Sequence, residues 1–316
     1  MYSVEALKLY QPGSFTGTYR LRDATYCESR HGQPYLKFML EDSTGSLPAY
    51  IWDEHLYREL YLPNYVLIKV TATTRVFDGQ LRVNVSNMVP TTEKTSGEVL
   101  RLIPQSLCPM PGMLSDLEYV LRQITIPILQ NFVEAVLADD GITFAFISVP
   151  ASLRHHHSYP GGLLYHSLDS IQMLERHRDF SRNSYELAIV AMLFHDIGKI
   201  MTMTSMMTRT SLGSCIDHDK LTLEVLSPYL RRLEQQWAPG AQELRYLLTW
   251  KINKPVPKYD MADLVACCDR LSAGRDMLMA KKKPHLSPFP VHYPEDAGNV
   301  TVALSQERYR NKREMV

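Results

Sequence analysis

Imidazoles and carboxylates in apolar surroundings are the residues of this sequence best suited to chemistry. They are His166, the dipeptide His195-Asp196 with Lys199 just after it, His218 and Asp269. Asp196 follows the apolar run 187–194, where an uncompensated carboxylate would cost several kcal/mol. Asp269 repeats the pattern in the apolar segment 264–271. A divalent metal ion neutralises such carboxylates, and imidazole with carboxylate is a ligand set that favours zinc, manganese or iron over calcium.

Each of these residues also has a purely structural interpretation. A single core histidine is more often hydrogen-bonded within the fold than bound to a metal, and Asp269 can pair with Arg270 or Lys199. The order along the chain favours the metal. A histidine, then His-Asp, then an aspartate, all in helical segments, resembles the H…HD…D pattern of the HD phosphohydrolase superfamily.

A closer resemblance comes from the residues around this pattern. Segment 155–168 reads His-His-His-Ser-Tyr-Pro-Gly-Gly-Leu-Leu-Tyr-His-Ser-Leu, and segment 195–199 reads His-Asp-Ile-Gly-Lys. Together they resemble the YhaM-type 3′-to-5′ exoribonucleases, which also carry an N-terminal OB domain. Segment 35–45, Tyr-Leu-Lys-Phe-Met-Leu-Glu-Asp-Ser-Thr-Gly, with Ile51-Trp52-Asp53, resembles that domain. The resemblance covers most of residues 15 to 280.

The resemblance implies a set of roles. His166, His195, Asp196 and Asp269 would hold one divalent ion, Mn²⁺ first, with Mg²⁺, Fe²⁺ or Zn²⁺ as alternatives, and His218 would lie close enough to hold a second. The metal would turn a bound water into a hydroxide that attacks the phosphorus of a terminal phosphodiester. Lys199 would steady a phosphate oxygen, or it is only a surface helix end. His156 and His157 would hydrogen-bond the phosphate or protonate the leaving oxygen, or they belong to a solvated loop.

One segment departs from the family pattern. YhaM-like proteins resemble each other in a His-His pair followed by glycine before the last aspartate, whereas segment 248–255 here reads Leu-Thr-Trp-Lys-Ile-Asn-Lys-Pro. A second ion at His218 would then lack a ligand, and Lys251 would bring a positive charge to that place. A site with one metal ion, an altered substrate and a protein that only binds nucleic acid all stay open.

The elements that position these residues begin with β structure. From residue 17 to about residue 90, short alternating runs are separated by turns, with Leu36, Phe38 and Leu40 on one face. The strands 66–76 and 81–89 join through Asp78-Gly79, a strong hairpin pattern. Five strands and a short helical piece near 54–60 predict a closed β-barrel of the OB type.

Aromatic and cationic residues on the barrel suit a single-stranded nucleic acid, because bases stack on aromatic rings beside cations that follow the backbone. The candidates are Tyr35, Lys37, Tyr50, Trp52, Arg75 and Arg82, with Arg20, Lys69 and Phe77 beside them. Residues 1–90 hold nine Lys/Arg against nine Asp/Glu, so no basic stripe is evident. The alternative is a barrel that serves interaction or assembly into a homo-oligomer. No residue separates RNA from DNA as the partner.

Helical periodicity follows a linker rich in Thr, Ser, Gly and Pro. Apolar residues recur at helical spacing in segments 114–137, 163–177, 185–196, 220–236 and 261–279. We therefore expect a multidomain α+β chain with an OB domain at 1–90, a linker at 91–113, an all-α HD-type helical domain at 114–280 and a C-terminal extension at 281–316. The five scattered cysteines predict neither a disulfide framework nor a thiolate zinc site. With no membrane segment and no secretory leader, we expect a cytoplasmic protein.

Together with the resemblance, the two domains imply a metal-dependent phosphodiesterase, foremost a 3′-to-5′ exonuclease on single-stranded RNA or DNA. The alternatives are an HD nucleotide or cyclic-nucleotide phosphohydrolase, an HD-type DNA-nicking relaxase, to which segment 155–168 is also similar, and a catalytically lapsed nucleic-acid-binding protein. We expect Asp196→Ala to remove metal and turnover together and to leave the fold largely intact.

Overall fold

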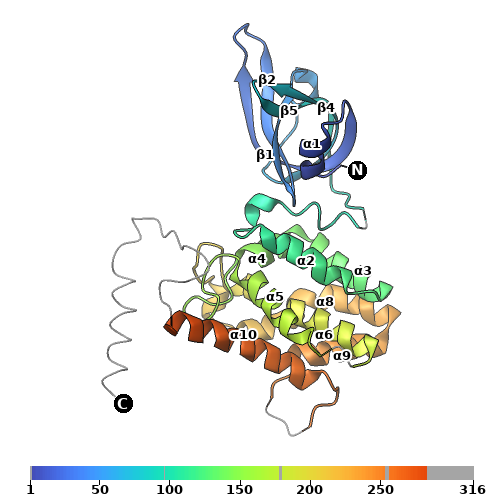
Figure 1. The fold of residues 1–316 in the computed structure, drawn as a ribbon, viewed down its shortest axis with the longest axis vertical. Coiled ribbons are helices and arrows are strands. Elements are labelled where there is room, and N and C mark those ends of the chain that lie inside the picture. Colours follow the sequence, from blue (N-terminus) through green and yellow to red (C-terminus); the bar gives the residue numbers. More distant parts are fainter. Residues whose placement is uncertain (1, 96, 178–179, 253–255, 283–316) are drawn as a thin grey trace, which may run out of the picture. The chain divides into compact units, whose positions relative to one another are not determined.

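The computed structural model describes residues 2–95, 97–177, 180–252 and 256–282. Met1–Gly274 form one compact unit and Arg275–Val316 a second. Two separate hydrophobic cores lie within the first unit, one between Val4 and Met88 and the other between Val99 and Cys268. A β-barrel followed by helices confirms the predicted α+β class (Figure 1). The predicted extension at 281–316 lies, from residue 283 on, outside the described residues.

The first core is the inside of a closed five-stranded barrel. Its strands are β1 (Phe15–Glu28), β2 (Pro34–Asp42), β3 (Gly45–Ile51), β4 (Val66–Phe77) and β5 (Gln80–Thr91), in the order β1-β2-β3-β5-β4. All neighbours are antiparallel except the short β3–β5 pair. Leu36, Phe38 and Leu40 point inward, as the alternation predicts, and the helical piece expected at 54–60 is the shorter 3₁₀ turn η1 (Glu54–Leu56).

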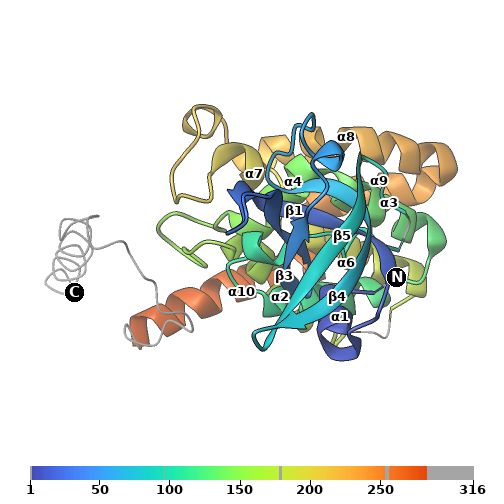
Figure 2. The same ribbon diagram turned by 90° about the horizontal axis from the view of Figure 1, so that it is seen from above.

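The hairpin between β4 and β5 forms where Asp78-Gly79 predicts it. Both residues have positive φ, 50° at Asp78 and 72° at Gly79. Positive φ at both central residues defines the type I′ turn, whose twist matches that of two antiparallel strands. The hairpin is long, because the register runs unbroken from Phe77 and Gln80 to Ala72 and Val85 before a bulge (Figure 2).

A short helix that the sequence analysis missed closes one end of the barrel. This is α1 (Val4–Tyr10), capped by Ser3, whose hydroxyl accepts a hydrogen bond from the Ala6 amide at 3.1 Å. The Val4 amide donates to Asp42 Oδ2 at 2.9 Å, which ties the helix to the end of β2. Val4 and Leu7 are fully buried in the barrel core, so α1 belongs to the barrel fold.

The second core is all helical. Its helices are α2 (Gly112–Arg122), α3 (Pro127–Ala138), α4 (Asp140–Ser148), α5 (Gly162–Leu174), α6 (Arg182–Phe194), α7 (Lys199–Thr202), α8 (His218–Gln236), α9 (Ala238–Thr249) and α10 (Ala262–Lys282), with the 3₁₀ turns η2 (Gln105–Leu107) and η3 (Leu212–Ser214). Every residue of α6 from Glu186 to Phe194 is buried, so α6 is the central helix. Among the described residues, no helix is both long and apolar enough to cross a membrane.

The single helix predicted at 114–137 is wrong, because the chain breaks before Pro127. Ile126 is extended, as steric clash with a following proline ring requires, and α2 and α3 are separate helices. The buried carboxylate of Glu186 accepts hydrogen bonds from the amides of Thr125 and Ile126, both at 2.8 Å. These bonds satisfy two donors at the start of α3 and hold the break against α6.

Arg20, a sequence candidate for nucleic-acid contact, instead links the barrel to the helices. Its side chain is 3 % exposed and donates to both oxygens of Asp140, at 2.8 and 2.7 Å. It also donates to the carbonyl oxygens of Leu102 and Tyr65, each at 2.8 Å. Because its guanidinium group makes these four hydrogen bonds within the protein, Arg20 is not available to bind a nucleic acid.

Candidate metal centre and aromatic face

Three helices deliver the histidines and aspartates of the H…HD…D pattern to one place. His166 lies on α5, His195 ends α6 with Asp196 directly after it, and Asp269 lies on α10. The Gly161-Gly162 pair lets α5 begin here. Gly161 has φ 78°, and a Cβ on Gly162 would overlap the carbonyl oxygen of His157. Glycine is therefore required for the histidine loop to pack against the start of α5.

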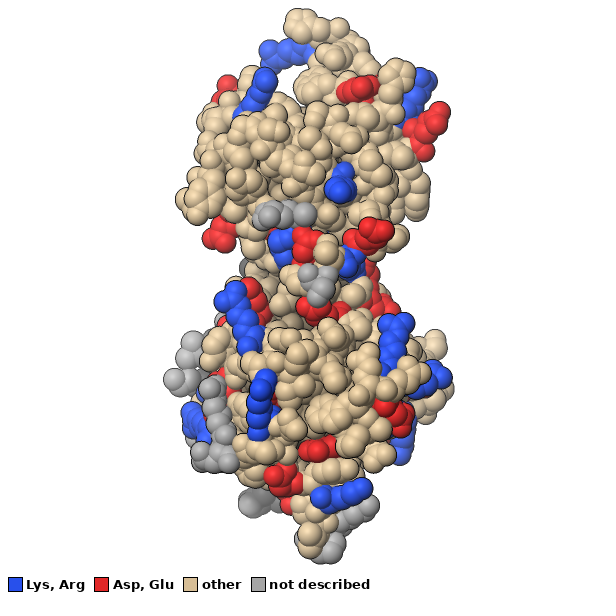
Figure 3. Space-filling model, turned by 90° about the vertical axis from the view of Figure 1, so that its right-hand side faces the viewer, with Lys and Arg blue, Asp and Glu red and all other residues tan. Residues whose placement is uncertain are grey.

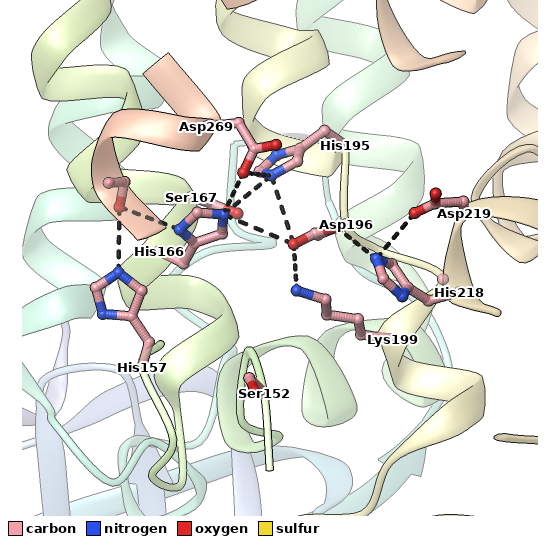
Figure 4. Close-up of polar contacts among 12 residues, drawn as sticks. Ser152, His157, His166, Ser167, His195, Asp196, Lys199, His218, Asp219 and Asp269 are labelled. Carbon is pink, nitrogen blue, oxygen red and sulfur yellow. Dashed lines mark hydrogen bonds and ion pairs between the residues drawn. The ribbon is translucent and has the colours of Figure 1, made fainter. Parts of the chain in front are cut away.

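The four side chains point their donor atoms at a common centre (Figure 4). His166 Nε2 lies 3.0 Å from Asp269 Oδ1, 3.2 Å from His195 Nε2 and 3.6 Å from Asp196 Oδ2. His195 Nε2 lies 3.5 Å from each of the same two carboxylate oxygens. Ligands held about 2.0–2.2 Å from one ion in a tetrahedral or octahedral site are themselves about 2.8–3.6 Å apart. The donor atoms of His166, His195 and Asp196 all lie within 4.8 Å of one another and fit a divalent ion in both chemistry and spacing. Asp269 Oδ1 lies within 3.5 Å of both imidazoles and adds a second carboxylate beside them.

The protonation of the protein alone shows how closely these charges interact. Burial disfavours the charged form of His195, but the carboxylates of Asp196 and Asp269 outweigh it and raise its pKa to about 9. Burial lowers the pKa of His166. Despite burial, the charge of Lys199 and then that of His195 hold the pKa of Asp196 well below its usual range, and hydrogen bonds from His166 and His195 lower the pKa of Asp269. Two carboxylates thus share the positive charge that surrounds them.

The ring orientation of His195 suits it to bind a metal. Its Nδ1 lies 2.8 Å from the carbonyl oxygen of Met192, one turn back on α6, to which an Nδ1–H donates. Metal-binding histidines are commonly held in this way, because a bond at one nitrogen fixes the lone pair of the other. The Nε2 lone pair of His195 is therefore available to the centre.

A second group shares Asp196. His218 Nε2 lies 3.1 Å from Asp196 Oδ1 and 3.0 Å from Asp219 Oδ1, and these hydrogen bonds outweigh burial and raise the pKa of His218 to about 9. A Cβ on Gly198 would overlap the carbonyl oxygen of His218, so glycine in His-Asp-Ile-Gly-Lys lets α8 approach. The sequence analysis missed Asp219, which follows His218 at the exposed start of α8 and lies in no apolar run.

The two residues at the place of the family His-His pair make other contacts. Lys251 Nζ binds Asp219, and its pKa rises chiefly through that hydrogen bond. The Trp250 indole N–H donates to Asp263 Oδ1 at 2.8 Å, and its ring stacks on Tyr246. The sequence suggested a positive charge of Lys251 near a second cation. In the structure this charge is paired with Asp219, one of the two carboxylates that contact His218.

Lys199 and His157 of the histidine loop are buried. Lys199 is 4 % exposed and ion-paired with Asp196, so it is not a surface helix end. His157 is 2 % exposed, and its ring contacts Tyr159 and Ser272, so it does not lie in a solvated loop. The ring of His156 lies 5.2 Å from that of His166, and burial, with the charge of Lys199, lowers its pKa to about 3.

Four of the predicted nucleic-acid residues, Tyr35, Lys37, Tyr50 and Arg82, lie on β2, β3 and β5, with Trp52 directly after β3 and Arg75 on β4. The rings of Tyr35 and Trp52 are 4.6 Å apart and those of Tyr35 and Tyr50 6.1 Å apart. Arg82 lies 5.5 Å over Tyr50. Lys37 pairs with Tyr50 across the strands, and Arg75 with Arg82. We call Tyr35, Lys37, Tyr50, Trp52 and Arg82 the aromatic face. On the side of the molecule in Figure 3, both charge signs are interspersed without a continuous basic band.

Comparison with known proteins confirms the resemblance seen in the sequence. The chain is 20 % identical over 285 residues to the 3′-5′ exoribonuclease YhaM of Bacillus subtilis (strain 168), which covers 87 % of this chain and 90 % of that protein. It is 22 % identical over 223 residues to YhaM of Oceanobacillus iheyensis, 70 % of each chain. No family model matches. Among solved structures, the N-terminal domain of PriB from Thermoanaerobacter tencongensis aligns at a TM-score of 0.23 and 17 % identity, over 26 % of this chain and 98 % of that one.

Proposed function

We propose that this chain, similar to the YhaM exoribonucleases over most of its length, is a metal-dependent phosphodiesterase that removes nucleotides from the 3′ end of single-stranded RNA or DNA. The observation that carries the proposal is the convergence of two imidazoles and two carboxylates from three helices on one centre. Such a donor set is the first requirement of metal-assisted phosphodiester hydrolysis, and the relatives' activity supplies the reaction and its direction.

His166, His195, Asp196 and Asp269 would hold the ion, with Mn²⁺ as the first choice and Mg²⁺, Fe²⁺ or Zn²⁺ as alternatives. When bound, a divalent ion there lowers the pKa of a water molecule and offsets charge on a phosphoryl oxygen. These ligands would use both aspartates, so the site would keep little of their negative charge and would accept a phosphodiester anion.

Two neighbouring residues would bind the reacting phosphate. Lys199 is buried beside Asp196, and its ammonium group would stabilise charge on a phosphate oxygen in a site with little water. His156 would donate a hydrogen bond to the phosphate as a neutral imidazole. Its pKa of about 3 leaves it unprotonated at neutral pH, which suits a hydrogen-bond donor better than an acid that protonates the leaving oxygen.

The aromatic face would bind the part of the nucleic-acid strand that lies away from the reacting 3′ end. Tyr35 and Trp52 offer ring faces on which bases stack, and Arg82 and Lys37 place positive charge beside them. Stacking contributes about 1–3 kcal/mol for each base and tolerates any base sequence. The proposed face therefore suits an exonuclease that must accept successive nucleotides.

The contacts of Lys251 favour a centre with one ion. Asp219 is the carboxylate that a second ion beside His218 would need, and it is already bound by Lys251. We therefore expect equilibrium dialysis of the chelator-stripped protein against Mn²⁺ to give one ion per chain, and two ions per chain in Lys251→Ala if the ammonium alone excludes the second. Two tightly bound ions in the wild type would contradict the one-ion centre.

The test of the reaction is a substrate panel with Mn²⁺. We expect 5′-labelled single-stranded RNA or DNA to give a ladder that shortens from the 3′ end, with blunt duplexes cut more slowly. A single cut in supercoiled DNA would indicate a relaxase, and hydrolysis of nucleotides alone would indicate a small-molecule phosphohydrolase. Oligonucleotides that bind but stay whole with the ion in place would indicate a non-catalytic protein, as the loss of the His-His pair would favour.

A further inference from the structure

A buried serine on α10 joins two histidines to a carboxylate. Ser272 is fully buried, and its Oγ lies 2.7 Å from Asp169 Oδ2 on α5. The same oxygen lies 3.1 Å from His166 Nδ1 and 3.1 Å from His157 Nε2. We propose that Asp169 and Ser272 are positioning residues, which fix the protons of His166 and His157 and so turn the Nε2 lone pair of His166 toward the metal centre. The inference rests on the proposed metal-dependent function.

The proton positions follow from the donors and acceptors present. A hydroxyl has one hydrogen and two lone pairs, and an ionised carboxylate only accepts. The Ser272 hydrogen therefore goes to Asp169, and both imidazole nitrogens that face Ser272 must carry hydrogens and donate to it. For His157, an Nε2–H leaves Nδ1 to accept from the Tyr159 hydroxyl, which lies 3.2 Å away. Ser272 Oγ, the two imidazole nitrogens that face it and His157 Nδ1 are then each matched with a partner of the opposite kind.

The consequence for His166 is chemical. With its hydrogen on Nδ1, its Nε2 has a lone pair directed at the atoms of His195, Asp196 and Asp269. With the hydrogen on Nε2, the same ring would present N–H and could not bind an ion. Partners that hold a ligand histidine in this way typically change metal affinity by about 10–100-fold. Asp169 would act by keeping the Ser272 hydrogen away from His166.

The arrangement on the two helices supports a positioning role. His166 and Asp169 lie one turn apart on α5, and Asp269 and Ser272 lie one turn apart on α10. Residues three apart lie on the same face of a helix. Each helix thus carries one candidate ligand and one residue of the hydrogen-bonded chain, so a single helix-to-helix contact sets both.

The chain also offers a matched control. Ser170 lies beside Asp169 on α5 and is fully buried, but its hydroxyl has no hydrogen-bond partner among the described residues. Ser170→Ala therefore removes the same atom as Ser272→Ala from the same core without removing a hydrogen bond to a ligand. Thermal unfolding of both variants shows whether any loss of binding is only a loss of folded protein.

The experiment measures Mn²⁺ affinity from the signal of free Mn²⁺ in electron paramagnetic resonance, on the full chain. We expect Ser272→Ala and Asp169→Ala each to weaken binding by about 10–100-fold, and Ser170→Ala to leave it unchanged. Because Asp169 acts through Ser272, the double variant should bind no more weakly than Ser272→Ala. Unchanged affinity in both single variants, or losses that add in the double variant, would overturn the positioning role. If Ser272→Ala does not fold, Asp169→Ala still decides, because Asp169 is only half-buried.

A spectroscopic readout separates positioning from mere support of the fold. In ¹⁵N-histidine-labelled protein, we expect His157 to carry its hydrogen on Nε2 in the wild type and in Ser170→Ala, and to populate both tautomers in Ser272→Ala. A wild-type hydrogen on Nδ1 would overturn the inference. Wild-type protein that binds no Mn²⁺ would instead refute the proposed metal centre. The two failures are therefore distinguishable, because the positioning role is tested by comparing variants with a wild type that does bind Mn²⁺.

Discussion

Removal of Asp196 should cost more than the metal. The sequence suggested that Asp196→Ala would leave the fold largely intact, but the structure places Lys199, 4 % exposed, against this carboxylate. The variant keeps that ammonium group in the core without its partner. Removing one member of a buried ion pair typically destabilises by about 3–5 kcal/mol, whereas replacing both members with apolar groups is often neutral.

The magnitude can be measured in chelated protein by thermal unfolding. At about 2–4 °C per kcal/mol for domains of 150–250 residues, we expect Asp196→Ala to lower Tm by roughly 6–20 °C. Asp196→Ala with Lys199→Met should be more stable than Asp196→Ala alone, although it carries one more substitution. Asp269→Ala is the control, because the Asp269 side chain is 41 % exposed and its loss should cost less.

A Tm of Asp196→Ala within 2 °C of wild type would show that Lys199 does not depend on this carboxylate. Additive losses of Tm from the two substitutions would show the same, because a coupled pair must give a double variant that loses less Tm than the sum of the two single variants.

Three further predictions concern the histidines, the aromatic face and the glycine of the His-Asp-Ile-Gly-Lys segment. The folded pKa of His195 and of His218 is about 9, above the ordinary 6.5, so their protonation stabilises the metal-free fold fully below pH 6.5 and this stabilisation is lost as pH rises through 9. The Tm of chelated protein should therefore fall between pH 6.5 and 9.5, whereas Mn²⁺ affinity should rise, because a metal ion binds neutral imidazoles. A Tm that does not change over this pH range would contradict the stabilising role of the two protonated histidines. Trp52→Ala should weaken binding of single-stranded RNA by about 5–150-fold, from 1–3 kcal/mol of stacking, with Tyr119→Ala on α2 as an exposed aromatic control. Gly198→Ala should lower the free energy of unfolding by about 1–3 kcal/mol and weaken Mn²⁺ binding, because the added Cβ must displace the backbone of His218. An unchanged free energy of unfolding and an unchanged Mn²⁺ affinity would show that α8 does not need this close approach.

Features with a local pattern were predictable from the sequence. The barrel followed from alternation and from Asp78-Gly79, because strand faces and tight turns are set by neighbouring residues. Asp196 stood out because a carboxylate next to an apolar helix requires a partner. The break before Pro127 was also visible in principle, since a residue before proline disfavours helix, but the apolar spacing on both sides concealed it.

Features that depend on tertiary contact were not predictable in this way. Ser272 and Asp169 lie on different helices, and neither a serine nor an aspartate in a helix indicates locally which distant side chain it meets. Asp219 contacts His218 and Lys251 only because the chain after α9 returns to the start of α8. The sequence therefore predicted candidate ligands, whereas the residues that orient or neutralise them required the structure.

We propose that the His166–His195–Asp196–Asp269 centre hydrolyses a nucleic acid from its 3′ end. The most direct test of this proposal is a time course with 5′-labelled single-stranded RNA, in which chelated wild type, Mn²⁺-loaded wild type and Mn²⁺-supplied Asp269→Ala are compared at equal folded concentration. We predict a ladder that shortens from the 3′ end in the Mn²⁺-loaded wild type and RNA of full length in the other two. Full-length RNA with Mn²⁺ bound to the wild type would show that this centre is not a nuclease site, and an unchanged ladder in Asp269→Ala would show that Asp269 is not needed for hydrolysis.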